Sequence, residues 1–232
     1  MGTDRRAFLG SGVAGAVALG VTAGAVRAEE KGGAAAAQKI SIIGINCSLR
    51  KGKTTFAALG AAMEAARAHS KRIETDIVEL AELNIDARQV MAPSKAGEQD
   101  DFEGLVAKLG SPSVGGIIVG SPVYFSQMSS LCKAFLERCM VFRKSKFALS
   151  NKVGGALAVG GARNGGQELT IQGILAALLC QEMVIVGDGR PTAHQGATLV
   201  SSNNSIADDD FGLKTAKNLG RRVAEVALQM HG

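Results

Sequence analysis

Residues 44–55, GINCSLRKGKTT, combine the groups with which proteins bind phosphate: hydroxyls, cations and glycine backbone. Their spacing almost completes the phosphate loop of nucleoside triphosphatases, G-x-x-x-x-G-K-[ST]. Gly52, Lys53 and Thr54 are in place, whereas Cys47 stands where the first glycine belongs. The stretch therefore predicts a phosphate site and leaves open which phosphate is bound.

A triphosphate site also needs a carboxylate at the end of a later strand, where it positions magnesium. Two later apolar runs end in IIVGSP and LAVGG, and neither tip carries an aspartate or a glutamate. The missing glycine also matters, because that residue lets the backbone curl around the phosphates. Both observations disfavour ATP hydrolysis.

The same stretch suits a single terminal phosphate. Ser48, Thr54 and Thr55 supply hydroxyls. Arg50 supplies a cation that can bond two phosphate oxygens, and a helix starting near Thr54 would point free backbone N–H groups at the ligand. The alternative is a polar turn with a good helix N-cap and no ligand.

A second candidate segment, GSPVYFSQMSS, follows an apolar run that ends near residue 122. Pro122 fixes the backbone there, and Tyr124 and Phe125 offer aromatic ring faces to a flat ligand. The alternative for the aromatic residues is ordinary core packing, which we expect for Phe125. Tyr124 is the only tyrosine in the chain.

A third candidate segment, GGARNGGQE, places four glycines around Arg163 and Asn164. Glycine is used where the backbone must approach a flat ligand closely. The alternative is a mobile turn without a ligand.

Alternating strands and helices must position these segments. Apolar runs predict strands, and apolar residues at helical spacing predict helices between them. The expected strands cover residues 39–45, 72–80, 114–122, 152–161 and 184–187, and the expected helices cover 54–70, 129–142, 167–183 and 210–230. This alternation predicts an α/β fold with a parallel sheet covered on both faces. Five strands suit the flavodoxin-like, doubly wound order 2-1-3-4-5, in which ligands bind outside the carboxyl ends of the strands.

The three segments CSLRKGKTT, GSPVYFSQMSSLCKAFLER and GGARNGGQELT occur in this order, each after its expected strand. Together they resemble the NADPH-dependent FMN reductase and iron–sulfur flavoprotein family, from about Lys39 to the last helix. The tail GLKTAKNLGRRVAEVA is similar to the closing helix of that family. The resemblance implies a flavodoxin-like fold that binds FMN, with the flavin rather than a side chain carrying out the chemistry.

The resemblance also assigns residues. The family's first motif is G-S-x-R-x-x-x-[NS]-T, so Ser48, Arg50 and Thr55 match and Cys47 replaces the glycine. These three matches are implied to bind the FMN phosphate, and we expect the Thr54 hydroxyl to join them. The residues implied to line the isoalloxazine are Pro122, Val123, Tyr124 and Phe125 on one side, and Gly161, Arg163, Asn164 and Gly165 on the other.

The iron–sulfur branch of the family carries a compact four-cysteine motif after the second strand. Residues 84–102 occupy that region here and contain no cysteine. Cluster ligation needs four thiolates at close spacing, and the four cysteines of this chain are dispersed. We therefore expect flavin without an iron–sulfur cluster. Cys132 and Cys139 are expected in the core, and a disulfide is the less favoured alternative.

The N-terminus contains TDRRAFLG, in which Arg5 and Arg6 are followed after one residue by Phe-Leu. An uncharged run rich in glycine and alanine covers residues 7–26, and the small residues of AVRA suit cleavage after Ala28. This arrangement resembles a twin-arginine export signal. The alternative is an uncleaved membrane anchor, for which the run is weakly hydrophobic. We expect a signal at 1–28, a linker at 29–38 and an FMN-binding domain at 39–232, located in the periplasm or otherwise exported.

Composition and charge set further limits. With 46% apolar and 20% charged residues, the 232-residue chain is long enough for one well-buried domain. The net charge of +5 falls to +3 without residues 1–28, which hold three arginines and one aspartate. So modest a charge argues against nucleic-acid binding. The three histidines and the Asp208–Asp210 run predict no metal site: His194 is expected in a surface loop, and the aspartates at the start of the last helix.

These observations predict an exported FMN-dependent oxidoreductase that transfers hydride or electrons to a quinone or another small acceptor. The resemblance implies NAD(P)H as donor and a homodimer or homotetramer. NAD(P)H is not expected outside the cytoplasmic membrane, so the donor is left open. The alternative is a non-enzymatic, flavodoxin-type electron carrier in the periplasm.

Overall fold

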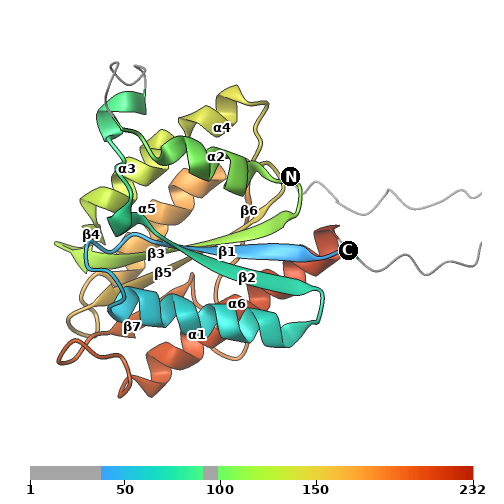
Figure 1. Cartoon of the computed structure of the whole chain (residues 1–232). Helices are drawn as coiled ribbons and strands as arrows, with labels where there is room; N and C mark the ends of the chain where they lie inside the picture. Colours follow the sequence, from blue (N-terminus) through green and yellow to red (C-terminus); the bar gives the residue numbers. More distant parts are fainter. Residues whose placement is uncertain (1–37, 91–98, 232) are drawn as a thin grey trace, which may run out of the picture. The chain divides into compact units, whose positions relative to one another are not determined.

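A parallel β-sheet forms the centre of the computed structural model, which describes residues 38–90 and 99–231 (Figure 1). The predicted export signal and most of the linker lie outside the described residues. The main strands are β1 (Ile40–Asn46), β2 (Ile73–Glu79), β3 (Val114–Tyr124), β5 (Val153–Gly160) and β6 (Val184–Ile185), in the order β2-β1-β3-β5-β6. Since β5 and β6 are the fourth and fifth parallel strands along the chain, the predicted order 2-1-3-4-5 is confirmed.

The fifth strand position is shared by two short segments. The predicted strand at 184–187 is only the two-residue β6, which pairs with the first residues of β5. A second segment, β7 (Ala197–Val200), pairs in parallel with the last four residues of β5. The chain leaves the sheet between them because the intervening sequence, GDGRPTAHQG, is rich in residues that interrupt strands.

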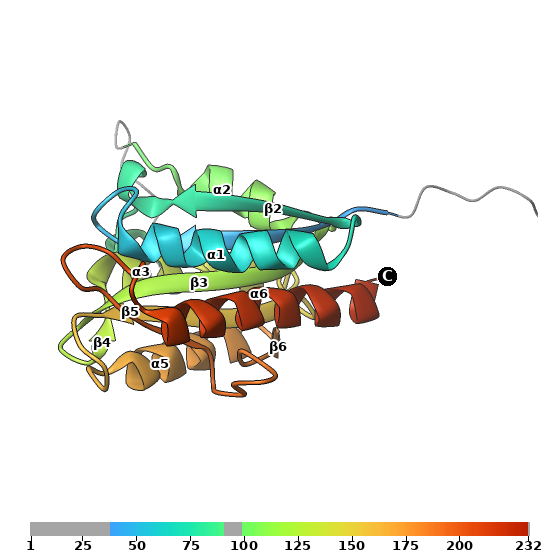
Figure 2. The same ribbon diagram turned by 90° about the horizontal axis from the view of Figure 1, so that it is seen from below.

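Helices cover both faces of the sheet, as predicted. One face carries α1 (Thr54–His69) and α6 (Asp210–His231), which lie side by side in Figure 2. The other carries α2 (Phe102–Gly110), α3 (Ser130–Arg138), α4 (Met140–Lys144) and α5 (Gln167–Leu179) (Figure 1). The helix predicted at 129–142 is broken at Cys139, and α2 was not predicted. None of the helices within the described ranges has the length and hydropathy that a bilayer-spanning helix requires.

Two apolar layers fix the helices on the sheet. Under α1 and α6, fully buried residues such as Ile42, Leu59 and Leu219 pack together, and burying such a side chain contributes about 1.5–3 kcal/mol. The two helices approach so closely that a Cβ atom at Gly220 would lie 1.8 Å from the Ala62 carbonyl oxygen. Only glycine fits there, which explains a glycine within a long helix.

A further short strand, β4 (Gln127–Met128), pairs antiparallel with the end of β3 and forms a hairpin at the carboxyl edge of the sheet. The loops that follow β1, β3 and β5 leave the sheet at this same edge, because the three strands are parallel. The architecture therefore brings the three candidate segments of the sequence together.

Candidate functional site

The loop between β1 and α1 is held in shape by its own polar groups and by β2. The Ser48 hydroxyl accepts a hydrogen bond from the Arg50 amide (3.1 Å) and lies 3.2 Å from the Arg50 carbonyl oxygen, to which it can donate. Glu79 accepts hydrogen bonds from the Gly52 amide (3.0 Å) and from the Asn46 side chain (2.7 Å). Sequence reasoning missed Asn46 and Glu79. The available signal was their position, since they end adjacent strands in the same register.

The start of α1 is left without a side-chain cap. Lys53 is the N-cap residue and makes no capping hydrogen bond, so the first N–H groups of the helix have no acceptor side chain. The hydroxyls of Thr54 and Thr55 also make no hydrogen bond within the part of the chain that the structure describes. The good N-cap that the alternative required is therefore not found at this helix start. Free N–H groups and two free hydroxyls at a helix start suit a phosphate.

Arg50 is exposed beside this helix start. Its Nη1 donates a hydrogen bond to Asn204 Oδ1 at 2.7 Å, across 154 residues of sequence. The guanidinium is thus held near the loop by a segment that follows β7. Because the Ser48 hydroxyl is engaged inside the loop, Arg50, Thr54 and Thr55 are the predicted phosphate ligands whose side chains keep free hydrogen-bonding capacity.

The second segment forms the end of β3 and the turn to β4. Pro122 is buried, Val123 is half-buried, and Tyr124 is exposed at the sheet edge. Phe125 and Ser126 both have positive φ (50° and 60°), the backbone of a two-residue hairpin turn with a primed geometry. The expected core packing of Phe125 is wrong: the turn directs this side chain to solvent, and it is fully exposed.

Ser129 joins the second segment to the first. Its hydroxyl donates to the Cys47 carbonyl oxygen (2.6 Å) and accepts from the Cys132 amide (3.0 Å), so it caps α3 and supports the phosphate loop. The Ser129 amide donates to Ser121 Oγ (3.0 Å). This fully buried serine fixes the distance between two of the candidate segments.

The third segment is an exposed turn between β5 and α5. Gly161, Arg163, Asn164 and Gly165 are all exposed in it. The buried Gln167 side chain braces the turn by accepting from the Gly165 amide (2.8 Å) and donating to the Ala162 carbonyl (2.7 Å). Sequence reasoning missed Gln167 because its role depends on the folded turn.

The second and third segments touch at Gly166. This glycine has φ +103°, and a Cβ atom there would lie 2.5 Å from Ser126 Cα. Arg163 forms an ion pair with Asp209 and donates to the Thr198 carbonyl (3.2 Å). The first segment therefore contacts the second, and the second contacts the third. Asp209, immediately before the last helix, contacts the third segment through Arg163.

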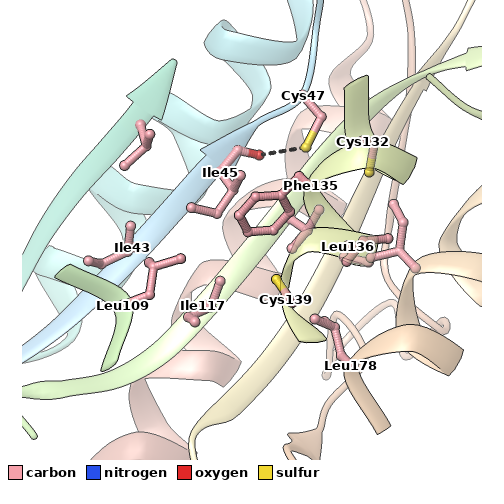
Figure 3. Close-up of a cluster of buried hydrophobic side chains, with 14 of the residues drawn as sticks. Ile43, Ile45, Cys47, Leu109, Ile117, Cys132, Phe135, Leu136, Cys139 and Leu178 are labelled. Atoms are coloured by element: carbon pink, nitrogen blue, oxygen red, sulfur yellow. Dashed lines mark hydrogen bonds between the residues drawn. The ribbon is translucent and has the colours of Figure 1, made fainter. Parts of the chain in front are cut away.

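Three of the four cysteines lie in the core rather than at the loop surface (Figure 3). Cys47, Cys132 and Cys139 are buried, which confirms the expectation for the latter two. Burial, and then the nearby Cys132 thiol, raise the pKa of Cys47, and burial raises that of Cys139. At the family's glycine position, the Cys47 side chain therefore packs as a neutral thiol beneath the loop.

The fourth cysteine, Cys180, is exposed at the end of α5. Among the described residues, no group of three or more histidine, cysteine, aspartate or glutamate side chains that could hold a metal ion is found. That the chain lacks an iron–sulfur cluster stays a prediction.

Two hollows lie beside the segment between β6 and β7. One, of about 660 Å³, is lined by residues that include Glu168, Gln172 and His194. The other, of about 510 Å³, is lined by residues that include Arg190 and Arg221. The predicted flavin residues line neither hollow. His194 is exposed in a surface loop, as expected, with its Nδ1 3.4 Å from the buried Asp188 carboxylate.

Comparison with known proteins agrees with this arrangement. A family model described as NADPH-dependent FMN reductase matches residues 40–198. An iron–sulfur flavoprotein of Methanocaldococcus jannaschii is 43% identical over 196 residues, covering 81% of this chain and 97% of that protein. An NAD(P)H dehydrogenase (quinone) of Azorhizobium caulinodans is 34% identical over 133 residues, covering 50% of this chain and 64% of that protein.

The fold also has solved counterparts. The flavodoxin, WrbA-like protein of Agrobacterium tumefaciens superimposes with a TM-score of 0.55 at 20% identity, covering 83% of this chain and 99% of the other. At this identity the likeness shows the fold alone, and it confirms the flavodoxin-like architecture.

Proposed function

The chain belongs to the NADPH-dependent FMN reductase family and is an FMN-dependent oxidoreductase, and we propose that it passes hydride or electrons from a reduced donor to a quinone or another small acceptor. The quinone is suggested by the name of the Azorhizobium caulinodans relative. NAD(P)H is the donor that the family description suggests.

The observation that carries this proposal is the uncapped start of α1. Its free N–H groups and the Thr54 and Thr55 hydroxyls provide donors for the FMN phosphate, with the Arg50 guanidinium beside them. The shape of the loop is fixed by Glu79 before any ligand binds. Such a preorganised loop loses little conformational entropy when the phosphate binds.

The exposed residues of the other two segments would hold the ring system. Tyr124 and Phe125 present aromatic faces, and Arg163, Asn164 and Gly165 form the exposed turn opposite them in the predicted assignment. Bound FMN supplies the redox chemistry, and these residues bind and orient it. No side chain is assigned a catalytic role.

We further propose export through the twin-arginine machinery, a homodimer or homotetramer, and FMN as the sole redox group. The Methanocaldococcus jannaschii relative is named an iron–sulfur flavoprotein, but residues 84–102 of this chain contain no cysteine. Export would separate the protein from cytoplasmic NAD(P)H. That separation favours a second candidate function, a periplasmic electron carrier reduced by a quinol or a protein partner.

The cofactor is tested on the purified chain. We expect a yellow protein from which FMN is released and identified by mass, with no stoichiometric iron. A colourless protein that also fails to bind added FMN would exclude the proposed function.

The donor and acceptor are tested in steady state, with NADH, NADPH and a quinol as donors and a benzoquinone as acceptor. Rapid NAD(P)H-dependent quinone reduction supports the enzyme. Slow NAD(P)H oxidation, with reduction only by the quinol or a protein partner, supports the carrier.

Export is tested by fractionating cells that express the full chain and a variant with Arg5→Lys and Arg6→Lys. We expect the native chain in the periplasm and the variant in the cytoplasm. Equal distribution of both would exclude the twin-arginine route.

A further inference from the structure

The segment 201–209, SSNNSIADD, contacts both arginines that the sequence assigns to the flavin. Arg50 donates to Asn204 Oδ1 at 2.7 Å, and Arg163 forms an ion pair with Asp209. The segment follows β7 and lies beyond residue 198, where the match to the family model ends. Its two arginine contacts are therefore a feature of this chain that the family match does not cover.

The tip of the segment is a tight turn. Ser202 and Ser205 exchange two backbone hydrogen bonds of 2.8 Å each. Between them, Asn203 and Asn204 have φ of 49° and 58°, a left-handed conformation that asparagine tolerates better than most residues. Because the turn is closed by its own backbone bonds, it presents the Asn204 amide to Arg50 from a fixed position.

The base of the segment is anchored at Asp209. This largely buried carboxylate accepts hydrogen bonds from the Val200 amide (2.7 Å) and the Gly212 amide (3.0 Å), and it pairs with Arg163. One side chain thus joins the end of β7, the start of α6 and the turn after β5. Movement of the tip relative to the flavin segments is restricted by this anchor.

We propose that Asn204 and Asp209 add a fourth element to the flavin site, in which Asn204 is the positioning residue for Arg50. This inference rests on the proposed binding of FMN. A guanidinium carries five N–H donors, so the bond to Asn204 leaves four for the phosphate. While Asn204 Oδ1 accepts from Arg50, the Asn204 amide nitrogen can donate to the ligand. Without Asn204, the long Arg50 side chain would have to be ordered when the ligand binds, which weakens binding.

A matched pair of variants tests the role of Asn204. Asn204→Gly removes the contact with Arg50, and Asn203→Gly changes the neighbouring residue of the same turn. Glycine accepts positive φ at both positions, so the turn is preserved in each. Within the described ranges, the Asn203 side chain makes no hydrogen bond.

The measured quantity is the Kd of FMN for the apoprotein, from the change in flavin fluorescence on binding. For Asn204→Gly we expect a Kd about fivefold to tenfold higher, the size of one hydrogen bond to a charged group in a partly exposed position. For Asn203→Gly we expect a Kd within about twofold of the native chain. Equal Kd values for the two variants would overturn the inference.

Riboflavin lacks the phosphate, so its Kd distinguishes a loss of Arg50 positioning from general damage to the flavin site. We expect Asn204→Gly to leave the riboflavin Kd unchanged. We also expect it to add little to the effect of Arg50→Ala on FMN, because both variants remove the same interaction. An equal loss of FMN and riboflavin affinity would overturn the positioning role.

Failure of the native chain to bind FMN would reject the proposed function, and this inference with it. Native binding of FMN with no difference between the two glycine variants would reject the inference alone. Thermal unfolding of both variants verifies that each is folded before its Kd is compared.

Discussion

The starts of α1 and α3 lie at the same edge of the sheet and are built in opposite ways. At α3, the Ser129 hydroxyl accepts from the Cys132 amide, so the helix start is closed by the protein itself. At α1, Lys53 supplies no side-chain cap. The free N–H groups of a helix start carry a partial positive charge. The contrast supports the proposal that α3 belongs to the scaffold, whereas the start of α1 binds the FMN phosphate.

The capped start of α3 also supports the loop that leads to α1. The same Ser129 hydroxyl donates to the Cys47 carbonyl oxygen, in the loop that leads to α1. The scaffold and the proposed ligand site thus share this buried bond. Changes at α1 should therefore alter ligand affinity, while changes at Ser129 should alter stability.

The largest expected effect comes from closing α1 artificially. In Lys53→Asp, the new carboxylate can cap the helix and should raise the unfolding free energy of the apoprotein by about 1 kcal/mol. The same carboxylate repels the FMN phosphate and replaces a cation, so the Kd of FMN should rise by about a hundredfold. Fluorescence titration and urea unfolding measure the two quantities.

Lys71→Asp is the matched control for this variant. It makes the same change in net charge just beyond the other end of α1 and should alter the FMN Kd by less than about twofold, because salt screens charges over that distance. Equal FMN binding by the two variants would show that the phosphate does not lie at the start of α1.

Removing the N-cap of α3 should give the next largest effect, a decrease in the unfolding free energy. Ser129→Ala removes the cap and leaves the buried Cys47 carbonyl without its donor, so the unfolding free energy should fall by roughly 2 kcal/mol. Ser130→Ala, at the exposed neighbouring position, should change it by less than about 0.5 kcal/mol. If urea unfolding gave the same midpoint for both variants, the scaffold role of Ser129 would be wrong.

Two buried thiols, Cys47 in the loop before α1 and Cys139 at the end of α3, predict a loss of stability at alkaline pH. The pKa values of Cys47 and Cys139 are raised because burial disfavours the thiolate. Above the ordinary thiol pKa of 9.0, the unfolded chain loses protons that the folded chain keeps. Each such thiol therefore lowers the unfolding free energy by about 1.4 kcal/mol per pH unit, and the stabilisation is complete only below about pH 9.

In Cys47→Ala, the unfolding free energy should fall less steeply with pH, by the contribution of one thiol. The slope is measured by urea unfolding between pH 8 and 10.5 with a reductant present. Cys180→Ala, which removes an exposed thiol, is the matched control for the substitution. Identical slopes for the native chain and Cys47→Ala would show that the Cys47 thiol ionises as easily in the folded protein as in the unfolded chain.

Much of the scaffold could be predicted because it follows from local patterns. Apolar runs predicted the parallel strands, the flavodoxin-like arrangement predicted their order, and the polar residues after each strand marked the carboxyl edge at which we propose that FMN binds. The two-residue β6 and the later β7 could not be predicted, because their pairing with β5 is a tertiary contact. Phe125 was misjudged because its apolar side chain suggested burial, whereas the backbone of the turn decides its direction.

The fine structure of the site was less predictable than its position. The sequence indicated Arg50 and Arg163 but not their partners, Asn204 and Asp209, which come from the other end of the domain. Residue type does separate the open helix start from the closed one, because a lysine side chain offers no hydrogen-bond acceptor and a serine side chain offers one. Ser129 caps α3 because the hairpin places its hydroxyl there, and Lys53 cannot accept a hydrogen bond from α1.

The smallest expected effect on the ligand comes from restoring the family's glycine in Cys47→Gly. The Cys47 side chain is fully buried in the core cluster that contains Cys132 (Figure 3). The variant should therefore keep the FMN Kd within about twofold, while the lost packing lowers the unfolding free energy by about 1 kcal/mol. A tenfold or larger rise in the Kd would mean that the thiol shapes the phosphate loop directly. The open start of α1 would then depend on Cys47 as well as on Ser129.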